Sequence, residues 1–457
     1  MRVHRLIAAP AMALLVAMPR RALPKLAIAL TVMLWGARQA QCVETAAPIA
    51  ERLARLDGER KAAKDAKDYT RYRASLLAMY DLLHGHPETV YALARAEALL
   101  GHSRQALRWL NRYAAMGLAR EGVAEDEAFA GLRASPAFGA VTHRLAANLQ
   151  PVSRATLALT LPESDLVCDD IAFDPKAETF YVGSVRHRKI LAVTRRGAVS
   201  EFVGEGKDGL WAVLALAVDS PRRRLWVSTA ALPPALSLTA ADAGRSALLR
   251  FDLDSRKLVK RYELPAPAPG EEQNLGDLTL DGAGNVFVSE GGSGVLYTVS
   301  SKEDSLQPLV GAGTFLAPQT PAATPDGKRL FVADYTLGIA VVDLRTRQTR
   351  WLPHPNDLAL NGIDGLYLAG RSLLAVQNGT KPNRVVRLRL DRTLSRITSW
   401  DVIESGSPQL GDPTHGVVVD GEFYFLGRTG WDRLGDDGAL KEGSAFEAPV
   451  VLRFPLR

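Results

Sequence analysis

Polar side chains stand where several short apolar strands are expected to begin. In IDGLYLAG, Asp364 precedes an apolar run, at a position where a buried strand would favour an apolar residue. The residues that precede similar runs elsewhere are Asp169 or Asp170, Trp211, Asp277, Gln319 and His415. Carboxylates brought close together raise one another's pKa unless a cation neutralises them. Oxygen ligands favour calcium, magnesium or manganese, and they can also hold zinc.

Other catalytic patterns are missing from the sequence. It contains no GxSxG nucleophile elbow, and its two cysteines, Cys42 and Cys168, form no CxxC pair. Only three of the eight histidines, His187, His354 and His415, follow residue 151, which disfavours an imidazole-rich zinc site. The sequence therefore favours a divalent cation held mainly by oxygen ligands.

The chain after residue 151 repeats short alternating strands separated by Gly, Asp-Pro and Asp-Gly turns. The six copies begin near Asp170, Leu214, Asp277, Pro321, Asp364 and His415. Their period of roughly 40–65 residues is that of propeller blades, once loop insertions are allowed. We therefore predict a mainly β protein with a six-bladed β-propeller over residues 151–457. The starts of its inner strands would bring the polar residues to one mouth of a central channel.

Three further features of this region lead to predictions. The last copy lacks a fourth strand, so ATLALTL, residues 155–161, is predicted to pair with it and close the ring, which removes free sheet edges. Two long loops, about 230–246 and 428–449, are predicted on the mouth face, where they either roof the pocket or are plain surface insertions. Four aspartates that follow inner strands are predicted to make turn hydrogen bonds, and they are Asp174, Asp219, Asp281 and Asp326.

Residues 42–150 show a helical period and resemble a tetratricopeptide unit. The residues that share one helix face at this period are Val90, Leu93, Ala94 and Ala98. Gly101 ends that helix, and Ser103 is predicted to cap the next one. We therefore expect an N-terminal α-helical, tetratricopeptide-like domain, acting either as a protein-docking surface or as a structural cap.

The first 41 residues resemble a secretory signal peptide. Arg20, Arg21 and Lys25 precede an apolar run over residues 26–35, which is too short to span a membrane. We expect a periplasmic or secreted protein, with an uncleaved N-terminal membrane anchor as the alternative. The net charge of +6 comes from scattered arginines without interleaved aromatic residues, so no nucleic-acid partner is expected.

The propeller region resembles the senescence marker protein/gluconolactonase family, also called regucalcin-like. DDIAFDP is similar to the family's Glu-Gly-Pro stretch, with Asp169 in the Glu position, and APQTPAATPDG to its Pro-Asn-Gly stretch, with Gln319 in the Asn position. IDGLYLAG keeps the family's Asp-Gly at Asp364. In LGDLTLDGAGNVFV, Gly276 replaces a substrate-contacting Asn and Asp277 follows it. The resemblance implies that Asp169, Gln319 and Asp364 are metal ligands and that Asp364 is the catalytic base.

Together, these patterns predict an exported metal-dependent hydrolase of the gluconolactonase type, acting on a small lactone or ester at the propeller mouth. Its predicted cofactor is a divalent cation, either calcium, manganese, magnesium or zinc. The predicted substrate-binding residues are Asp277, Trp211, Asn378 and His415. The alternative is a non-catalytic propeller that binds a ligand or serves as a scaffold, with the helical domain docking a protein.

Overall fold

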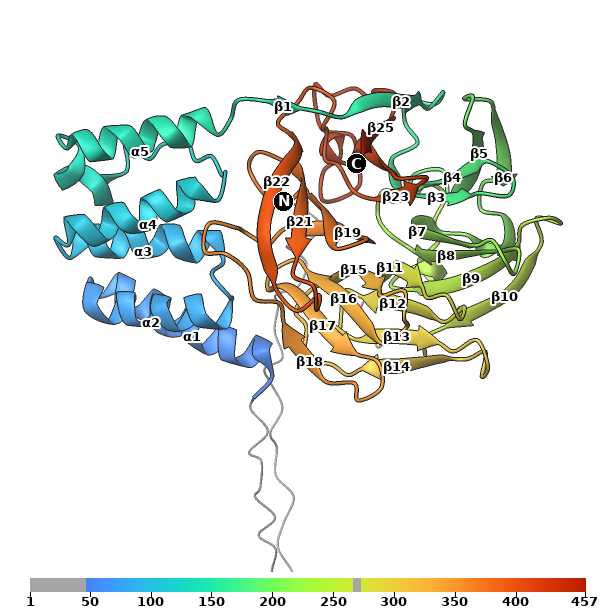
Figure 1. Cartoon of the computed structure of the whole chain (residues 1–457), viewed down its shortest axis with the longest axis horizontal. Helices are drawn as coiled ribbons and strands as arrows, with labels where there is room; N and C mark the ends of the chain where they lie inside the picture. Colours follow the sequence, from blue (N-terminus) through green and yellow to red (C-terminus); the bar gives the residue numbers. More distant parts are fainter. Residues whose placement is uncertain (1–46, 266–272) are drawn as a thin grey trace, which may run out of the picture.

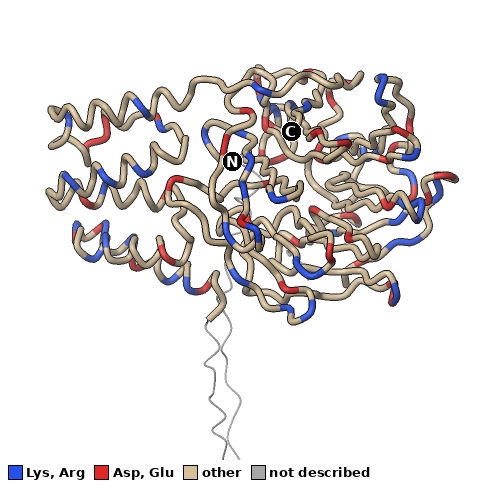
Figure 2. Tube along the Cα trace, in the orientation of Figure 1, with Lys and Arg blue, Asp and Glu red and all other residues tan. Residues whose placement is uncertain are grey.

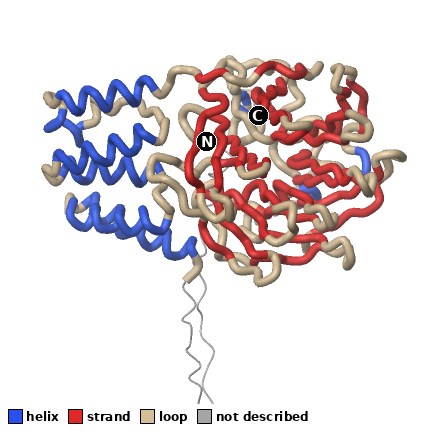
Figure 3. Tube along the Cα trace, in the orientation of Figure 1, coloured by secondary structure: helices blue, strands red, loops and turns tan. Residues whose placement is uncertain are grey.

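The computed structural model of the chain describes residues 47–265 and 273–457. Helices form one side of the molecule and strands the other, as Figures 1 and 3 show. The predicted signal segment and Cys42 lie outside the described residues. Export therefore stays a prediction, and Cys168 is a buried, free cysteine. None of the described helices is both long enough and apolar enough to cross a membrane.

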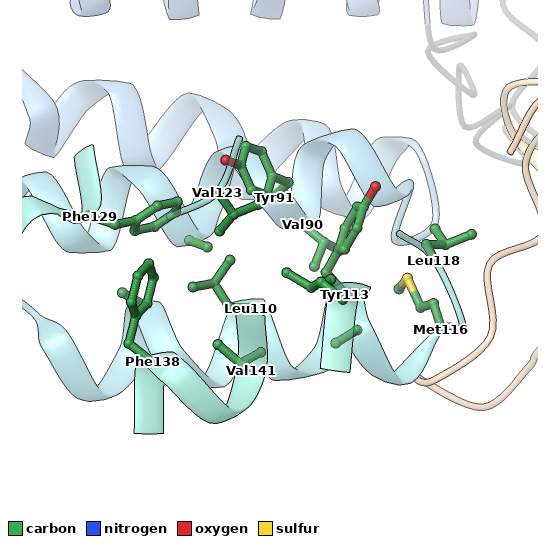
Figure 4. Close-up of a cluster of buried hydrophobic side chains, with 14 of the residues drawn as sticks. Val90, Tyr91, Leu110, Tyr113, Met116, Leu118, Val123, Phe129, Phe138 and Val141 are labelled. Atoms are coloured by element: carbon green, nitrogen blue, oxygen red, sulfur yellow. The ribbon is translucent and has the colours of Figure 1, made fainter. Parts of the chain in front are cut away.

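Five α-helices occupy the first part of the described chain. They are α1 (Ile49–Asp65), α2 (Tyr69–Leu82), α3 (Pro87–Leu99), α4 (Ser103–Ala115) and α5 (Pro136–Ala147), with the 3-10 helix η2 (Glu127–Leu132) before α5. Val90, Leu93 and Ala94 are fully buried, as the predicted helix face requires. Ser103 does not cap α4, because His102 holds the N-cap position and Ser103 is already the first helical residue. Figure 4 shows the core between α3, α4 and α5, where Tyr91, Leu110 and Phe138 are labelled.

The strands form six antiparallel sheets that follow one another along the chain. The first three are β3 (Cys168–Asp174), β4 (Thr179–Ser184), β5 (Lys189–Thr194) and β6 (Val199–Val203); β7 (Ala212–Asp219), β8 (Arg224–Ala230), β9 (Ser246–Asp252) and β10 (Leu258–Glu263); and β11 (Leu275–Leu280), β12 (Val286–Glu290), β13 (Leu296–Val299) and β14 (Leu306–Val310). The next two are β15 (Pro318–Ala323), β16 (Arg329–Asp334), β17 (Gly338–Asp343) and β18 (Thr349–Trp351); and β19 (Ile363–Ala369), β20 (Ser372–Gln377), β21 (Arg384–Leu390) and β22 (Ile397–Ser405), to which β1 (Val152–Ser153) adds. The sixth is β23 (Gly416–Val419), β24 (Glu422–Arg428), β25 (Val450–Pro455) and β2 (Thr156–Thr160).

The first strand of each sheet packs against the first strand of the next, and β23 of the sixth sheet packs against β3 of the first. The predicted six-bladed propeller is therefore confirmed. The closing strand is confirmed as well, because β2 pairs antiparallel with β25. The four aspartates expected in turns all accept hydrogen bonds there, as Asp174 does from Lys176 N and Asp281 from Asn285 N.

The inner strands share an irregularity that positions polar side chains. The register of β3, β7, β11, β15 and β19 shifts near the start of each strand, which marks a β-bulge. A bulge turns the local side chain out of the regular alternation and is common beside functional sites. Asp364 lies in the bulge of β19, and Asp277 lies in that of β11.

In the view of Figure 2, Lys and Arg residues are interspersed with Asp and Glu residues over the helices and the propeller. This distribution agrees with the scattered arginines of the sequence.

Candidate metal centre

Three side chains from three different blades meet at the mouth of the channel. Asp277, Asp364 and His415 each offer a ligand atom, and these atoms lie within 4.8 Å of one another. Asp277 and His415 are 5% and 2% exposed, whereas Asp364 keeps more contact with solvent. The group therefore has a buried side and a side that a small molecule can approach.

His415 is fixed by its two ring nitrogens. Its Nδ1 lies 2.8 Å from the backbone oxygen of Asp169, which can only accept, so Nδ1 carries a proton. Its Nε2 lies 3.0 Å from Asp277 Oδ2. Within the described chain, however, Nε2 makes no hydrogen bond of acceptable geometry. A buried nitrogen facing a carboxylate in this way needs either a second proton or a cation between the two atoms.

Asp277 is held by the neighbouring blade. Thr320 Oγ1 lies 2.7 Å from Asp277 Oδ2 and 2.7 Å from the backbone oxygen of Asp364. Ser289 Oγ lies 3.2 Å from both the backbone nitrogen and the backbone oxygen of Asp277. Thr320 thus links the two carboxylate-bearing strands β11 and β19 through the strand between them, β15.

Asp364 is oriented by a short chain of side-chain hydrogen bonds. Asn378 Nδ2 donates to Asp364 Oδ2 at 2.6 Å, and Tyr335 OH lies 3.0 Å from Asn378 Oδ1. Asn378 therefore contacts the predicted base directly. A contact between Asn378 and a substrate stays a prediction.

Asp169 lies beside the three residues, and its carboxylate has another partner. Trp431 Nε1 donates to Asp169 Oδ1 at 2.9 Å. Trp431 begins the 3-10 helix η5 (Trp431–Arg433) in the long loop of the sixth blade. In the described structure this loop packs with the long loop of the second blade in one apolar cluster, to which Ala235 and Leu434 belong. Of the two long loops, that of the sixth blade therefore reaches the mouth through Trp431, and that of the second blade packs against it.

The hydrogen bonds of the other two predicted site residues lie outside the three-residue group. The Gln319 side-chain nitrogen lies 3.4 Å from the backbone oxygen of Ala317, just before its own strand. Within the described chain it makes no hydrogen bond to Asp277, Asp364 or His415. Trp211 precedes β7, donates from Nε1 to Asp242 Oδ1 at 2.8 Å and has the Arg261 guanidinium over its ring. The bulge of β7 contains Leu214, so an apolar residue occupies the position that we expected Trp211 to take.

Burial and mutual repulsion shift the ionisation of the cluster. Burial raises the pKa of Asp364, His415 lowers it, and the carboxylates of Asp277 and Asp412 raise it, so that together they bring it to about 7. Burial likewise raises the pKa of Asp169 well above its usual range. Burial by itself would lower the pKa of His415, but the carboxylates of Asp277, Asp364 and Asp170 outweigh it and raise that pKa well above its usual value. The cluster therefore attracts positive charge, in the form of a proton or a metal ion.

Behind the cluster, a cavity of about 360 Å³ follows the inner strands along the channel. Its polar end contains Asp170, Asp277, Thr320 and His415, and most of its remaining wall is apolar. Asp170 serves the fold at this level, because its carboxylate accepts from Ile171 N at 2.7 Å and from Leu216 N at 2.8 Å, joining blades one and two.

The donor set of Asp277, Asp364 and His415 fits a divalent cation. Ligands bound at about 2.1 Å to one ion lie about 3 Å apart, close to the separation of His415 Nε2 and Asp277 Oδ2. His415 also donates its other ring nitrogen to a backbone carbonyl, as metal-binding histidines usually do. Two carboxylates and one imidazole suit manganese or zinc better than calcium, which favours oxygen ligands alone.

Sequence reasoning missed Thr320 and Trp431. Thr320 follows Gln319 directly, so counting the bulge residue would have pointed to it. Trp431 carried only the weaker signal of an aromatic residue in a long loop expected at the mouth.

Comparisons with known proteins give fold neighbours only. No family model matches the sequence, and no curated protein matches it. Among solved structures, a gluconolactonase from Xanthomonas campestris is 14% identical over 67% of this chain and 94% of that chain, with a TM-score of 0.43. A calcium-binding regucalcin from Agrobacterium tumefaciens is 14% identical over 65% and 93%, with a TM-score of 0.45. A PQQ-bound aldose sugar dehydrogenase from Streptomyces coelicolor is 13% identical over 67% and 99%, with a TM-score of 0.47. The function of this chain is therefore argued from its own residues.

Proposed function

We propose that the propeller binds a divalent cation through Asp277, Asp364 and His415 and hydrolyses a small lactone or ester at its mouth. The observation that carries the proposal is the convergence of three ligand atoms within 4.8 Å. The buried Nε2 of His415 supports it, because this atom lies 3.0 Å from Asp277 Oδ2 without a well-directed hydrogen bond and a cation between the two would satisfy both. Asp364 is common to this ligand set and to the one predicted from the sequence. Asp277 and His415 take the places that were predicted for Asp169 and Gln319.

The residues around the cation have distinct proposed roles. A bound cation would polarise the carbonyl of the substrate as a Lewis acid. Asp364, which keeps more contact with solvent than the other two ligands, accepts the proton of the attacking water. Asn378 holds the carboxylate of Asp364 in place. The bond between the carbonyl carbon and the ring or ester oxygen breaks, and the departing oxygen takes up that proton.

Metal addition to the stripped protein tests the proposal. The full chain is treated with chelator, and its thermal unfolding is followed while manganese, zinc, magnesium or calcium is added. A cation that binds only the folded state at 100 times its Kd stabilises it by about 2.7 kcal/mol, so the midpoint should rise. The variants Asp364→Asn and His415→Gln should lose this rise. Asp412→Asn, which changes a nearby carboxylate outside the ligand set, should keep it.

Two outcomes would contradict the proposal. If no cation raises the midpoint, His415 is a doubly protonated partner of the carboxylates and the propeller is the non-catalytic binding module. If a cation binds but a panel of lactones and aryl esters is not turned over, the metal site stands and the hydrolase assignment fails.

We also propose that helices α1 to α4 form a tetratricopeptide-like unit and that the protein is exported. The full burial of the small residues Ala94 and Ala106 between α3 and α4 supports the first point. The basic start and apolar run of the N-terminal segment support the second. Cell fractionation tests export, because a cytoplasmic protein of full length would contradict it. A protein partner of the helices remains part of the same proposal.

A further inference from the structure

The structure points to a role for the helical part that differs from docking. We propose that the helical part holds the Asp364 region in place through Arg384 and Gln377, two positioning residues remote from any substrate. Arg384 is 1% exposed and Gln377 is fully buried. They are a cross-strand pair on β21 and β20, and Gln377 pairs in turn with Ile363, the residue before Asp364.

A continuous series of hydrogen bonds runs from the helices to that pair. Arg384 Nη1 donates to the backbone oxygen of Met116 at 2.6 Å, at the C-terminal end of α4. Arg384 Nε donates to Gln377 Oε1 at 2.8 Å. Gln377 Nε2 then donates to the backbone oxygens of Ala359 and Asn361 at 3.1 and 2.8 Å. These two residues belong to the segment that leads directly into Asp364.

A second contact reaches the residue that orients Asp364. Ala119 N donates to the backbone oxygen of Lys381 at 2.8 Å. Lys381 lies in the loop between β20 and β21, which also carries Asn378, and Asn378 Nδ2 donates to Asp364 Oδ2. The helical part thus contacts both segments that determine where the Asp364 carboxylate lies.

The surroundings of Arg384 are shaped for this contact. Gly117 has a φ of +71°, and a Cβ there would come within 3.1 Å of Arg384 Nη1 and 3.4 Å of Trp400. The absence of a side chain lets the chain after α4 approach the guanidinium, which also lies over the Trp400 ring at 5.4 Å. None of the described carboxylates pairs with Arg384, and burial lowers its pKa to about 10. Burying a guanidinium without a carboxylate partner costs free energy that a buried apolar residue would not cost. The hydrogen bonds of Arg384 have to offset this cost.

The position of Gln377 recurs in other blades. Ser184, Glu290 and Asp334 also end the second strand of their sheets and pair with the first residue of the inner strand. Glu290 accepts from Asn274 N, and Asp334 accepts from Leu316 N and Ala317 N, so each fixes the segment before its inner strand. In the fifth blade the residue at this position, Gln377, is connected to the helices through Arg384.

Hydrogen exchange of the full chain tests this role without reference to any metal. In Arg384→Lys and in Gln377→Glu, amides of residues 359–364 and 378–383 should exchange about tenfold faster, as expected for the loss of a buried hydrogen bond. Gln377→Glu keeps an acceptor for Arg384 and replaces the donor to Ala359 and Asn361 by a carboxylate oxygen, so it tests the step from Gln377 to the segment before Asp364. The matched control is Glu121→Gln, which breaks the exposed pair with Lys381 on the same loop and should leave exchange unchanged.

Manganese affinity gives a second readout, which rests on the proposed function. The Kd of manganese should rise about tenfold in Arg384→Lys and Gln377→Glu and stay unchanged in Glu121→Gln. If the unaltered protein binds none of manganese, zinc, magnesium and calcium, the proposed function fails and hydrogen exchange alone decides the positioning role. Faster exchange spread evenly over the whole chain, or none near Asp364, would overturn that role.

Discussion

At the residue scale, the site depends on the unusual position of His415. Its ring is fixed by a hydrogen bond from Nδ1 to the backbone oxygen of Asp169, a residue of another blade, and its Nε2 faces the carboxylate of Asp277. Three nearby carboxylates raise its pKa, so the imidazole is either doubly protonated or bound to a cation at neutral pH. The choice between these two states decides whether the mouth is a metal centre or a structural ion-pair cluster.

Thr320 provides a residue-scale prediction. Replacing Thr320 by Val keeps the shape of the side chain and removes the hydroxyl that lies 2.7 Å from Asp277 Oδ2 and from Asp364 O. We expect the free energy of unfolding to fall by about 1–3 kcal/mol, because one of these two buried acceptors loses its donor. Urea unfolding measures this loss. Manganese titration of the same variant should show weaker binding, and unchanged binding would show that Thr320 supports the fold alone.

At the element scale, neighbouring blades are joined by charged side chains near their outer strands. Asp304, in the turn between β13 and β14, contacts three residues of blade two: Arg250 at 2.6 Å, Tyr262 at 2.5 Å and Lys260 at 3.0 Å. Burial raises the pKa of Asp304, but these partners outweigh it and hold that pKa below its usual range. The ionised carboxylate is thus the form that the fold stabilises.

The depressed pKa of Asp304 predicts a pH-dependent contribution to stability. Its contribution is full above the unfolded pKa of about 3.9 and is lost as the pH falls toward the folded value. We expect Asp304→Asn to lower the free energy of unfolding by about 1 kcal/mol at pH 7, a value reduced for partial solvent exposure, and by less near pH 3, where the folded carboxylate is still ionised and part of the contribution remains. Urea unfolding at both pH values checks this, and an equal loss at both would contradict it.

At the scale of the whole molecule, the helices and the propeller share buried contacts. Ala359 of the propeller is 2% exposed and belongs to the core of the helical part. His84 Nδ1 lies 3.2 Å from Leu337 O, and the His84 ring lies 4.8 Å from that of Trp351. Figure 4 shows Met116 and Leu118 together at one end of the helical core, the end from which Met116 O accepts from Arg384.

These shared contacts predict that the two parts unfold together. We expect one calorimetric transition, with the van't Hoff enthalpy equal to the calorimetric enthalpy, and coincident helix and tryptophan signals. Two separate transitions would show that the interface contributes little. In that case the positioning role of Arg384 would also lose its support.

The sequence by itself determined the number of blades, the closing strand and the turn aspartates. These features follow from local patterns, namely period-two alternation, Asp-Gly turns and the repetition of both, which do not depend on distant residues. The sequence also placed Asp277, Asp364 and His415 at the starts of inner strands, where the structure has them.

Only the tertiary structure decided which of those side chains meet. The inner-strand bulges shift the register, and a shift of one residue turns a side chain to the other face of its sheet, which put Leu214 where Trp211 was expected. The contacts of Asp169 with His415 and Trp431 join residues some 250 positions apart in the sequence, and they exist only because the ring closes. The burial of Arg384 against Met116 depends likewise on how the helices pack on the fifth blade, for which no local pattern carries a signal.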